Sequence, residues 1–141
     1  MATNKPEVIW LDLDGTACIR HEGRSVYEFA TCDQDLPNEP VVKAVRALAR
    51  VYPIIVMTGR ERRFQPQCEK WLSCYKIPYL AINMRQDGDK RGDDIVKAEL
   101  YKLHVEPFYE VVFCLDDRDR VVKMSRETLG LTVFQVQPGN F

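Results

Sequence analysis

Two aspartates separated by a single leucine are the residues of this sequence best suited to chemistry. Asp12 and Asp14 follow the apolar run 8–11 and precede Gly15 and Thr16. Residues two apart in an extended chain point the same way, so the two carboxylates face one space. Carboxylate oxygens hold hard divalent cations, and one carboxylate can attack an electrophile while the other moves a proton. A solvated acidic turn after a strand is the simpler interpretation of the same pattern.

Other polar residues stand directly after two further apolar runs. Thr58 follows one run, and Asp116 with Asp117 follows the other. The carboxyl ends of parallel strands meet at one edge of a sheet, where open α/β folds bind their ligands. Together with the first aspartate pair this makes three polar groups at one such edge, which are hard to explain as solvated turns, so we expect them to form one site.

The elements that must position these residues alternate between strand and helix. Alternation of this kind predicts an α/β fold with about five parallel strands and helices on both faces. We expect a single domain over residues 1–141, with a small flap at about 17–36 after the first strand. The expected strands are 8–13, 52–57, 79–82, 111–115 and 131–136, and the expected helices begin near Asn38, Pro66, Asp93 and Val121.

Two local expectations matter for the site. The stretches 60–63 and 83–92 are polar and charged, and we expect both to be loops. The helix expected at 93–104 is predicted to turn Ile95 and Leu103 toward the core, together with Val96 and Leu100.

The bulk composition is that of an ordinary soluble globule, with 45% hydrophobic residues, 29% charged residues and a formal net charge of −1. Any nucleic acid must therefore be met by a local basic patch. The five cysteines show neither CxxC pairs nor zinc spacing, so we expect reduced, mostly buried thiols. Residues 1–5 are expected to be a loose lead-in, without a signal peptide or membrane span, and these features favour a cytoplasmic protein without membrane contact.

The order of these motifs resembles the haloacid dehalogenase (HAD) superfamily, and the DxDGT form at 12–16 is similar to its phosphatase branch. The other motifs are Thr58-Gly59, Lys97 and Asp116-Asp117. The chain further resembles the 3′-phosphatase domain of bacteriophage polynucleotide kinase/phosphatase. The residues that carry this resemblance are Cys32-Asp33, Gly59-Arg60, 88–89, 93–97, 116–124 and 135–141. No GxxxxGK[ST] phosphate loop occurs, so the kinase half is not represented. The resemblance implies a HAD-like domain without a cap, in the cytoplasm of a bacterial or phage-infected host cell.

The resemblance also implies roles for individual residues. Asp12 would be the nucleophile that forms an aspartyl-phosphate, and Asp14 would protonate the leaving oxygen and then activate water. Thr58 would hold phosphoryl oxygens, and Lys97 would offset the charge of the transferring group. Arg85 is equally well explained as an ordinary surface charge. The implied Mg²⁺ ligands are Asp12, Asp14, Asp116 and Asp117, and the implied substrate-binding residues are Arg24, Gly59, Arg60, Arg85 and Asp93.

Three functions fit this sequence. The first is a Mg²⁺-dependent phosphatase that removes 3′-phosphates from DNA or RNA ends in nucleic-acid repair, with a separate kinase or ligase as partner. The short segments between the motifs leave no room for a cap, so a polymer end can reach the site. The alternative is a phosphatase of nucleoside monophosphates, which would use the same motifs, and the third is a non-catalytic phosphate- or metal-binding module. The expected basic rim is Arg20, Arg24, Arg60, Arg62, Arg63, Arg85, Lys90 and Arg91.

Overall fold

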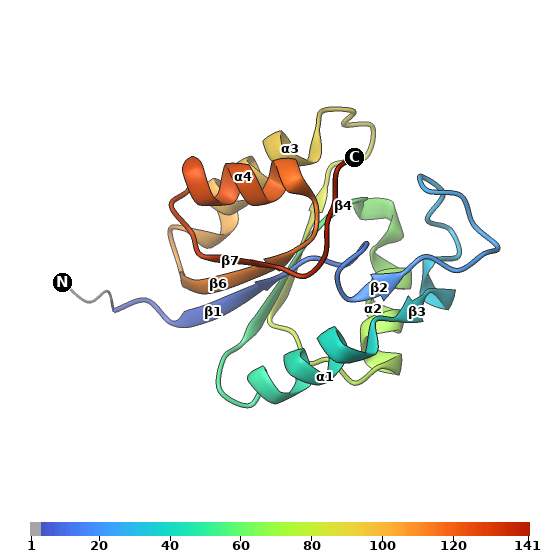
Figure 1. Cartoon of the computed structure of the whole chain (residues 1–141), viewed down its shortest axis with the longest axis horizontal. Helices are drawn as coiled ribbons and strands as arrows, with labels where there is room; N and C mark the ends of the chain where they lie inside the picture. Colours follow the sequence, from blue (N-terminus) through green and yellow to red (C-terminus); the bar gives the residue numbers. More distant parts are fainter. Residues whose placement is uncertain (1–3) are drawn as a thin grey trace.

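A parallel five-stranded sheet forms the centre of the protein, as the computed structural model shows for residues 4–141 (Figure 1). The first part of the expected lead-in, residues 1–3, lies outside the described residues. The sheet order is β5-β4-β1-β6-β7, and every neighbouring pair is parallel. The predicted α/β class is therefore confirmed. The strands are β1 (Glu7–Leu11), β4 (Ile54–Glu61), β5 (Ala81–Arg85), β6 (Glu110–Asp116) and β7 (Val133–Gln135).

Helices cover both faces of this sheet. In Figure 1, α1 (Glu39–Leu48) and α2 (Gln65–Cys74) lie on one face, while α3 (Asp93–Leu100) and α4 (Asp119–Glu127) lie on the other. A short π-helical turn, Tyr101–Val105, continues α3. This arrangement makes β1 the middle strand of a three-layered molecule.

The packing of the core explains why β1 is an unbroken run of apolar residues from Val8 to Leu11. Ile9 and Leu11 pack into the cluster beneath α1 and α2, while Val8 and Trp10 pack into the cluster on the α3 and α4 side. All four side chains are at most 1% exposed, because a central parallel strand is covered on both faces. The thiols of Cys18, Cys32, Cys68 and Cys114 are also buried, and Cys74 is exposed; all five are free, as expected.

A small antiparallel hairpin forms the predicted flap after β1. It pairs β2 (Cys18–Ile19) with β3 (Leu36–Pro37), and the intervening segment contains the 3₁₀ turn Cys32–Gln34. Asn38 occupies the N-cap position of α1, as predicted. Its side chain does not cap the helix, however, because Nδ2 donates to the carbonyl of Thr16 (3.0 Å) and ties the flap to the end of β1.

Two segments expected to be loops belong partly to strands. β4 continues through Arg60 to Glu61, and only 62–64 leave it in a 3₁₀ turn. β5 begins two residues later than predicted and includes Arg85. The cause is pairing rather than local preference, because β4 and β5 resume their ladder at Glu61 and Arg85 after a register shift. Charged residues can therefore continue these strands, because the backbone hydrogen bonds between β4 and β5 do not depend on the type of side chain.

The predicted inner face of α3 is also wrong in part. Ile95 is 48% exposed and Leu103 is 65% exposed, while Lys97 is 2% exposed. Lys97 points into the protein because its ammonium group pairs with the carboxylates of Asp12 and Asp116 at the edge of the sheet. The buried face of α3 is therefore not the face that the spacing of its apolar residues predicts. Among residues 4–141, we find no helix with the length and apolar character to cross a membrane.

The burial of β1 predicts a large cost for truncating its core side chains. Ile9→Ala should lower the free energy of unfolding by about 2–5 kcal/mol in urea titration, because it leaves a cavity between sheet and helices. Val51→Ala is the control, since Val51 is 71% exposed and its truncation should cost less than about 0.5 kcal/mol. Equal effects of the two substitutions would contradict the placement of β1 in the core.

Candidate active site

The candidate site lies where the order of the strands reverses. β1 and β6 are neighbours in the sheet but are separated by β4 and β5 in the chain, and their carboxyl ends lie side by side. The amide of Asp12 donates to the carbonyl of Leu115 (3.0 Å), which fixes the start of the turn after β1. A cavity of about 1050 Å³ opens there, and Asp12, Asp14, Asp116 and Asp117 line it. The sequence placed these four residues together correctly.

Three of these aspartates form a buried cluster. Asp12, Asp116 and Asp117 are at most 4% exposed, and one oxygen from each lies within 4.8 Å of the others. Lys97 Nζ donates to Asp12 Oδ1 (2.8 Å) and to Asp116 Oδ2 (2.9 Å). Thr16 Oγ1 donates to Asp12 Oδ2 (2.8 Å). Three carboxylates thus lie close together with one ammonium group, which donates to two of them.

The excess negative charge shifts the proton affinities of the cluster. Burial raises the pKa of Asp12 well above its ordinary value, Asp116 raises it further, and Lys97 only partly opposes them. Burial also raises the pKa of Asp117. Burial alone would lower the pKa of Lys97, but Asp116 and Asp12 hold it above its ordinary value. Three hard oxygen donors with uncompensated charge fit a divalent cation, so the cluster is a candidate metal site.

Asp14 lies in a different electrostatic environment. Its side chain is 42% exposed. Arg60 donates two hydrogen bonds to it, from Nε to Oδ2 (2.9 Å) and from Nη2 to Oδ1 (2.7 Å). Arg24 Nη2 also donates to Oδ1 (3.1 Å). Burial alone would raise the pKa of Asp14, but Arg60 and Arg24 hold it below its ordinary value. The pKa values of two carboxylates two residues apart are therefore shifted in opposite directions, and in the protein without a cation a proton is favoured on Asp12 rather than on Asp14.

Asp35 is the residue that sequence analysis missed at this position. It is 1% exposed and accepts hydrogen bonds from Arg24 Nε (2.9 Å), Arg24 Nη2 (2.6 Å) and Arg60 Nη2 (3.1 Å). Trp71 Nε1 fixes its backbone carbonyl (2.9 Å). Asp35 therefore orients both guanidinium groups that hold Asp14. Within the sequence it is one aspartate of a polar loop, and no spacing distinguishes it from Asp33.

A third charged group lies beside the cavity around Asp93. This carboxylate accepts hydrogen bonds from Arg85 and from Arg118 Nη1 (2.7 Å), and Arg85 Nε donates to the carbonyl of Gly59 (2.7 Å). A β-carbon on Gly59 would collide with the Asp93 carboxylate, so the close approach requires glycine. Arg85 is therefore an anchored residue of the cavity wall. Arg118 was not among the residues predicted for the site, although it directly follows the second aspartate pair.

Some predicted residues lie in less direct positions. Thr58 is fully buried, and its Oγ1 accepts a hydrogen bond from the amide of Arg60 (3.2 Å). Arg60 is also fully buried, behind Asp14, and contacts Cys68 Sγ through Nη1 (3.4 Å). Arg62 does not belong to the rim of this cavity. It lines a separate cavity of about 280 Å³ beside β5, because β4 extends further than the sequence indicated.

The charge cluster predicts how stability depends on pH without divalent cations. The raised pKa of Asp12 means that the folded state binds more protons than the unfolded state above about pH 4, so stability should fall as the pH rises toward neutral. The lowered pKa of Asp14 affects the stability only below about pH 4, where this carboxylate takes up a proton. Adding Mg²⁺ at neutral pH should raise the melting temperature and flatten this decline, as measured by thermal unfolding in EDTA and in Mg²⁺.

Asp117→Asn is the informative variant for this prediction. Removing one carboxylate should stabilise the EDTA-treated protein at neutral pH and reduce the shift produced by Mg²⁺. A wild-type melting temperature that is the same in EDTA and Mg²⁺ at every pH would contradict the assignment of the cluster as a cation site.

The Asp35 contacts predict a second, distinct effect. Asp35→Asn leaves two buried guanidinium groups to share Asp14, so the free energy of unfolding should fall by about 3 kcal/mol in chemical denaturation. Asp33→Asn is the matched control, because Asp33 pairs at the surface with Lys70 (3.2 Å) and its loss should cost less than about 1 kcal/mol. Similar small losses for both variants would show that Asp35 does not hold the arginines.

Comparison with known proteins places this geometry in a family. A family model for the polynucleotide kinase PNKP phosphatase domain matches residues 6–141. A putative bifunctional polynucleotide kinase/RNA ligase of Autographa californica nuclear polyhedrosis virus is 30% identical over 135 residues, which are 93% of this chain and 19% of that protein.

Two solved structures are similar over almost the whole chain. A chain in the structure of the Pnkp1/Rnl/Hen1 complex matches with a TM-score of 0.94 and 39% identity, covering 99% of this chain and 49% of that one. A chain in the structure of the Pnkp1/Rnl/Hen1 RNA repair complex matches with the same TM-score and identity, covering 99% of this chain and 45% of that one. The chain spans about a fifth of the viral relative and less than half of each solved chain. On these matches and on its fold, the chain belongs to the family of HAD-like phosphatase domains of polynucleotide kinase PNKP.

Proposed function

We propose that this protein is a Mg²⁺-dependent phosphomonoesterase that removes 3′-phosphates from polynucleotide ends through an aspartyl-phosphate on Asp12. The observation that carries the proposal is the pairing of two unlike carboxylates at the open end of β1. Asp12 is fixed by Lys97 and Thr16, and Asp14, two residues on, is gripped by two arginines. Membership of the PNKP phosphatase family supports a phosphomonoester substrate.

The chemistry follows from these positions. Asp12 attacks phosphorus, so that a bond forms between its carboxylate oxygen and phosphorus while the bond to the 3′-oxygen breaks. Asp14 gives its proton to the departing 3′-oxygen and then takes one from the water that cleaves the aspartyl-phosphate. The resting pKa of Asp14 is lowered by Arg60 and Arg24. A phosphate dianion arriving beside Asp14 raises the affinity of this carboxylate for a proton, so Asp14 takes a proton from solvent before it acts as the acid.

Asp12, Asp116 and Asp117 are the residues that would hold Mg²⁺. Asp117 is the more available partner of Asp12, because Asp116 already accepts hydrogen bonds from Lys97 (2.9 Å) and from the Asp117 amide (2.9 Å). When bound, Mg²⁺ neutralises the repulsion between a phosphate dianion and a carboxylate nucleophile. Lys97 keeps the Asp12 carboxylate in place and offsets charge on the transferring group.

The remaining residues support these groups. Arg24 and Arg60, oriented by Asp35, position Asp14. We assign Gly59, which lines the cavity, and the adjoining Thr58 to presenting the backbone of β4 to the phosphoryl group. We assign Arg85 and Arg118 to contact with substrate oxygens and Asp93 to holding both guanidinium groups, since a carboxylate does not itself bind phosphate.

The shape of the cavity supports a polymer end as substrate. Between β1 and α1 lies only the flap, and the 1050 Å³ cavity is not covered by a further folded unit in the part of the chain that the structure describes. The similar chains include a putative polynucleotide kinase/RNA ligase and members of an RNA repair complex. A kinase or ligase is therefore the partner activity that we propose for this protein as well.

The proposal predicts a specific pattern in a substrate panel. With Mg²⁺, the wild type should release phosphate from 3′-phosphorylated RNA or DNA oligonucleotides and not from 5′-phosphorylated ones. Asp12→Asn should lower kcat by more than about 10³-fold, because a carboxamide is a poor nucleophile. Asp33→Asn, outside the cavity, should keep wild-type activity.

Two results would overturn the proposal. Substantial Mg²⁺-dependent turnover by purified Asp12→Asn would exclude Asp12 as the nucleophile. Efficient hydrolysis of nucleoside monophosphates with no preference for oligonucleotides would instead favour a small-nucleotide phosphatase.

A further inference from the structure

The cations around the cavity fall into two groups that differ in their partners. Most are already neutralised, because each forms an ion pair with a carboxylate. By contrast, Lys90, Arg120 and Arg20 are exposed, line the cavity and form no ion pair with any of residues 4–141. The neutralised group is Arg63 with Glu61, Arg85 and Arg118 with Asp93, and Arg91 with Asp89 and Glu99.

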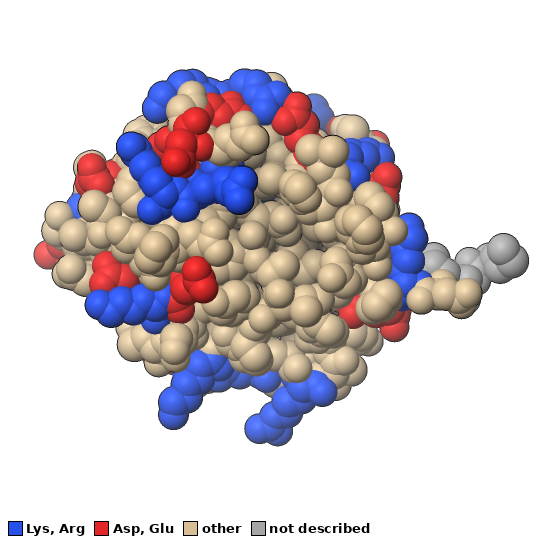
Figure 2. All heavy atoms as spheres, turned by 180° about the vertical axis from the view of Figure 1, so that it is seen from behind, with Lys and Arg blue, Asp and Glu red and all other residues tan. Residues whose placement is uncertain are grey.

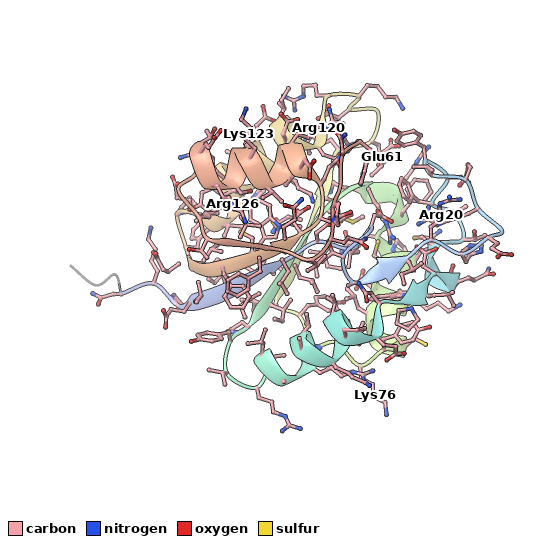
Figure 3. All side chains as sticks on the ribbon, in the orientation of Figure 1. Arg20, Glu61, Lys76, Arg120, Lys123 and Arg126 are labelled. Atoms are coloured by element: carbon pink, nitrogen blue, oxygen red, sulfur yellow. The ribbon has the colours of Figure 1, made fainter. Side chains whose placement is uncertain are left out.

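Two of these unpaired cations, Lys90 and Arg120, lie on the same side of the cavity mouth. Arg120 Nη1 comes to 3.4 Å from the position that a β-carbon on Gly92 would take, and Lys90 is two residues before Gly92 in the chain. Gly92 immediately precedes α3, the helix that carries Lys97. Figure 3 shows Arg120 at the start of α4, with Arg20 on the flap and Glu61 between them in this view.

Other routes out of the cavity are less favourable to a polyanion. Toward β5, Arg91 is held between the carboxylates of Asp89 and Glu99, which repel phosphate. On the flap, Arg20 uses Nη1 to bond the carbonyl of Arg24 (2.7 Å). The face behind the molecule shows mixed blue and red side chains around a broad uncharged area, not a continuous basic surface (Figure 2).

We propose that Lys90 and Arg120 form a surface that binds the backbone phosphates of a single-stranded polynucleotide whose 3′ end occupies the cavity. The inference rests on the proposed function and adds the path of the strand, which leaves the site between the loop before α3 and the start of α4. Unpaired exposed cations suit this task, since they can bind backbone phosphates, and so release the counterions of the polynucleotide, without first breaking an ion pair. Because the contacts are to phosphates, the surface does not discriminate between bases.

The experiment compares Lys90→Ala/Arg120→Ala with Lys123→Ala on the full chain. Lys123 is one turn further along α4, exposed and outside the cavity lining (Figure 3). Two quantities are measured at several salt concentrations: kcat/KM for a 3′-phosphorylated oligonucleotide and for the matching 3′-mononucleotide, and anisotropy of a labelled oligonucleotide with a free 3′-hydroxyl. RNA and DNA versions of each oligonucleotide are run in parallel.

We expect the double variant to lose about 10-fold in oligonucleotide kcat/KM at low salt and less for the mononucleotide. The salt dependence should weaken by about 0.7 log units per log unit of salt for each lost contact. Lys123→Ala should match the wild type. Equal losses on both substrates, or an unchanged salt dependence in the double variant, would overturn the inference.

The binding measurement separates this inference from the proposed function. If the wild type binds the oligonucleotide through Lys90 and Arg120 but releases no phosphate from it, the surface stands and the proposed reaction fails. If phosphate is released from oligonucleotides but the double variant binds them like the wild type, the reaction stands and the surface is wrong. Loss confined to RNA or to DNA identifies the polymer that the surface selects.

Discussion

The burial of three carboxylates against a single ammonium group is the constraint on which the site depends. Asp12, Asp116 and Asp117 are brought together because the carboxyl ends of β1 and β6 are adjacent. Lys97 alone cannot balance them, so the arrangement is completed only by a proton or a cation. The same constraint explains why α3 turns a lysine inward and leaves Ile95 at the surface.

A second cluster of charges surrounds Asp14 and, unlike the first, is balanced. Arg24 and Arg60 together face Asp14 and Asp35, so this group is neutral overall and stable without a cation. The arginines come from the flap and from β4, and Asp35 ties them together within the flap. The position of Asp14 therefore depends on arginines of the flap and of β4, whereas the position of Asp12 depends on Lys97 of α3 and on the carbonyl of Leu115. This difference gives two neighbouring aspartates different chemistry.

The parts of the structure that the sequence could predict are those set by local pattern. The unbroken apolar run of β1 identified a central strand, and the acidic residues after β1 and β6 identified the edge that carries the site. Contacts between distant segments could not be read in this way. The extension of β4 through Arg60 depends on pairing with β5, and Asp35 gains its importance only because the flap folds over Asp14. Likewise, Arg91 forms ion pairs with two carboxylates and Arg120 forms none with any described residue, which spacing along the chain does not reveal.

The steric course at phosphorus tests the central claim, attack by Asp12, most directly. A 3′-phosphoryl group made chiral with three oxygen isotopes would be transferred by the enzyme from an oligonucleotide to an alcohol acceptor, and the configuration of the product determined. Attack by Asp12 followed by attack of the acceptor makes two in-line displacements. The account therefore predicts net retention of configuration. Net inversion would mean one direct displacement without an aspartyl-phosphate, and would contradict it.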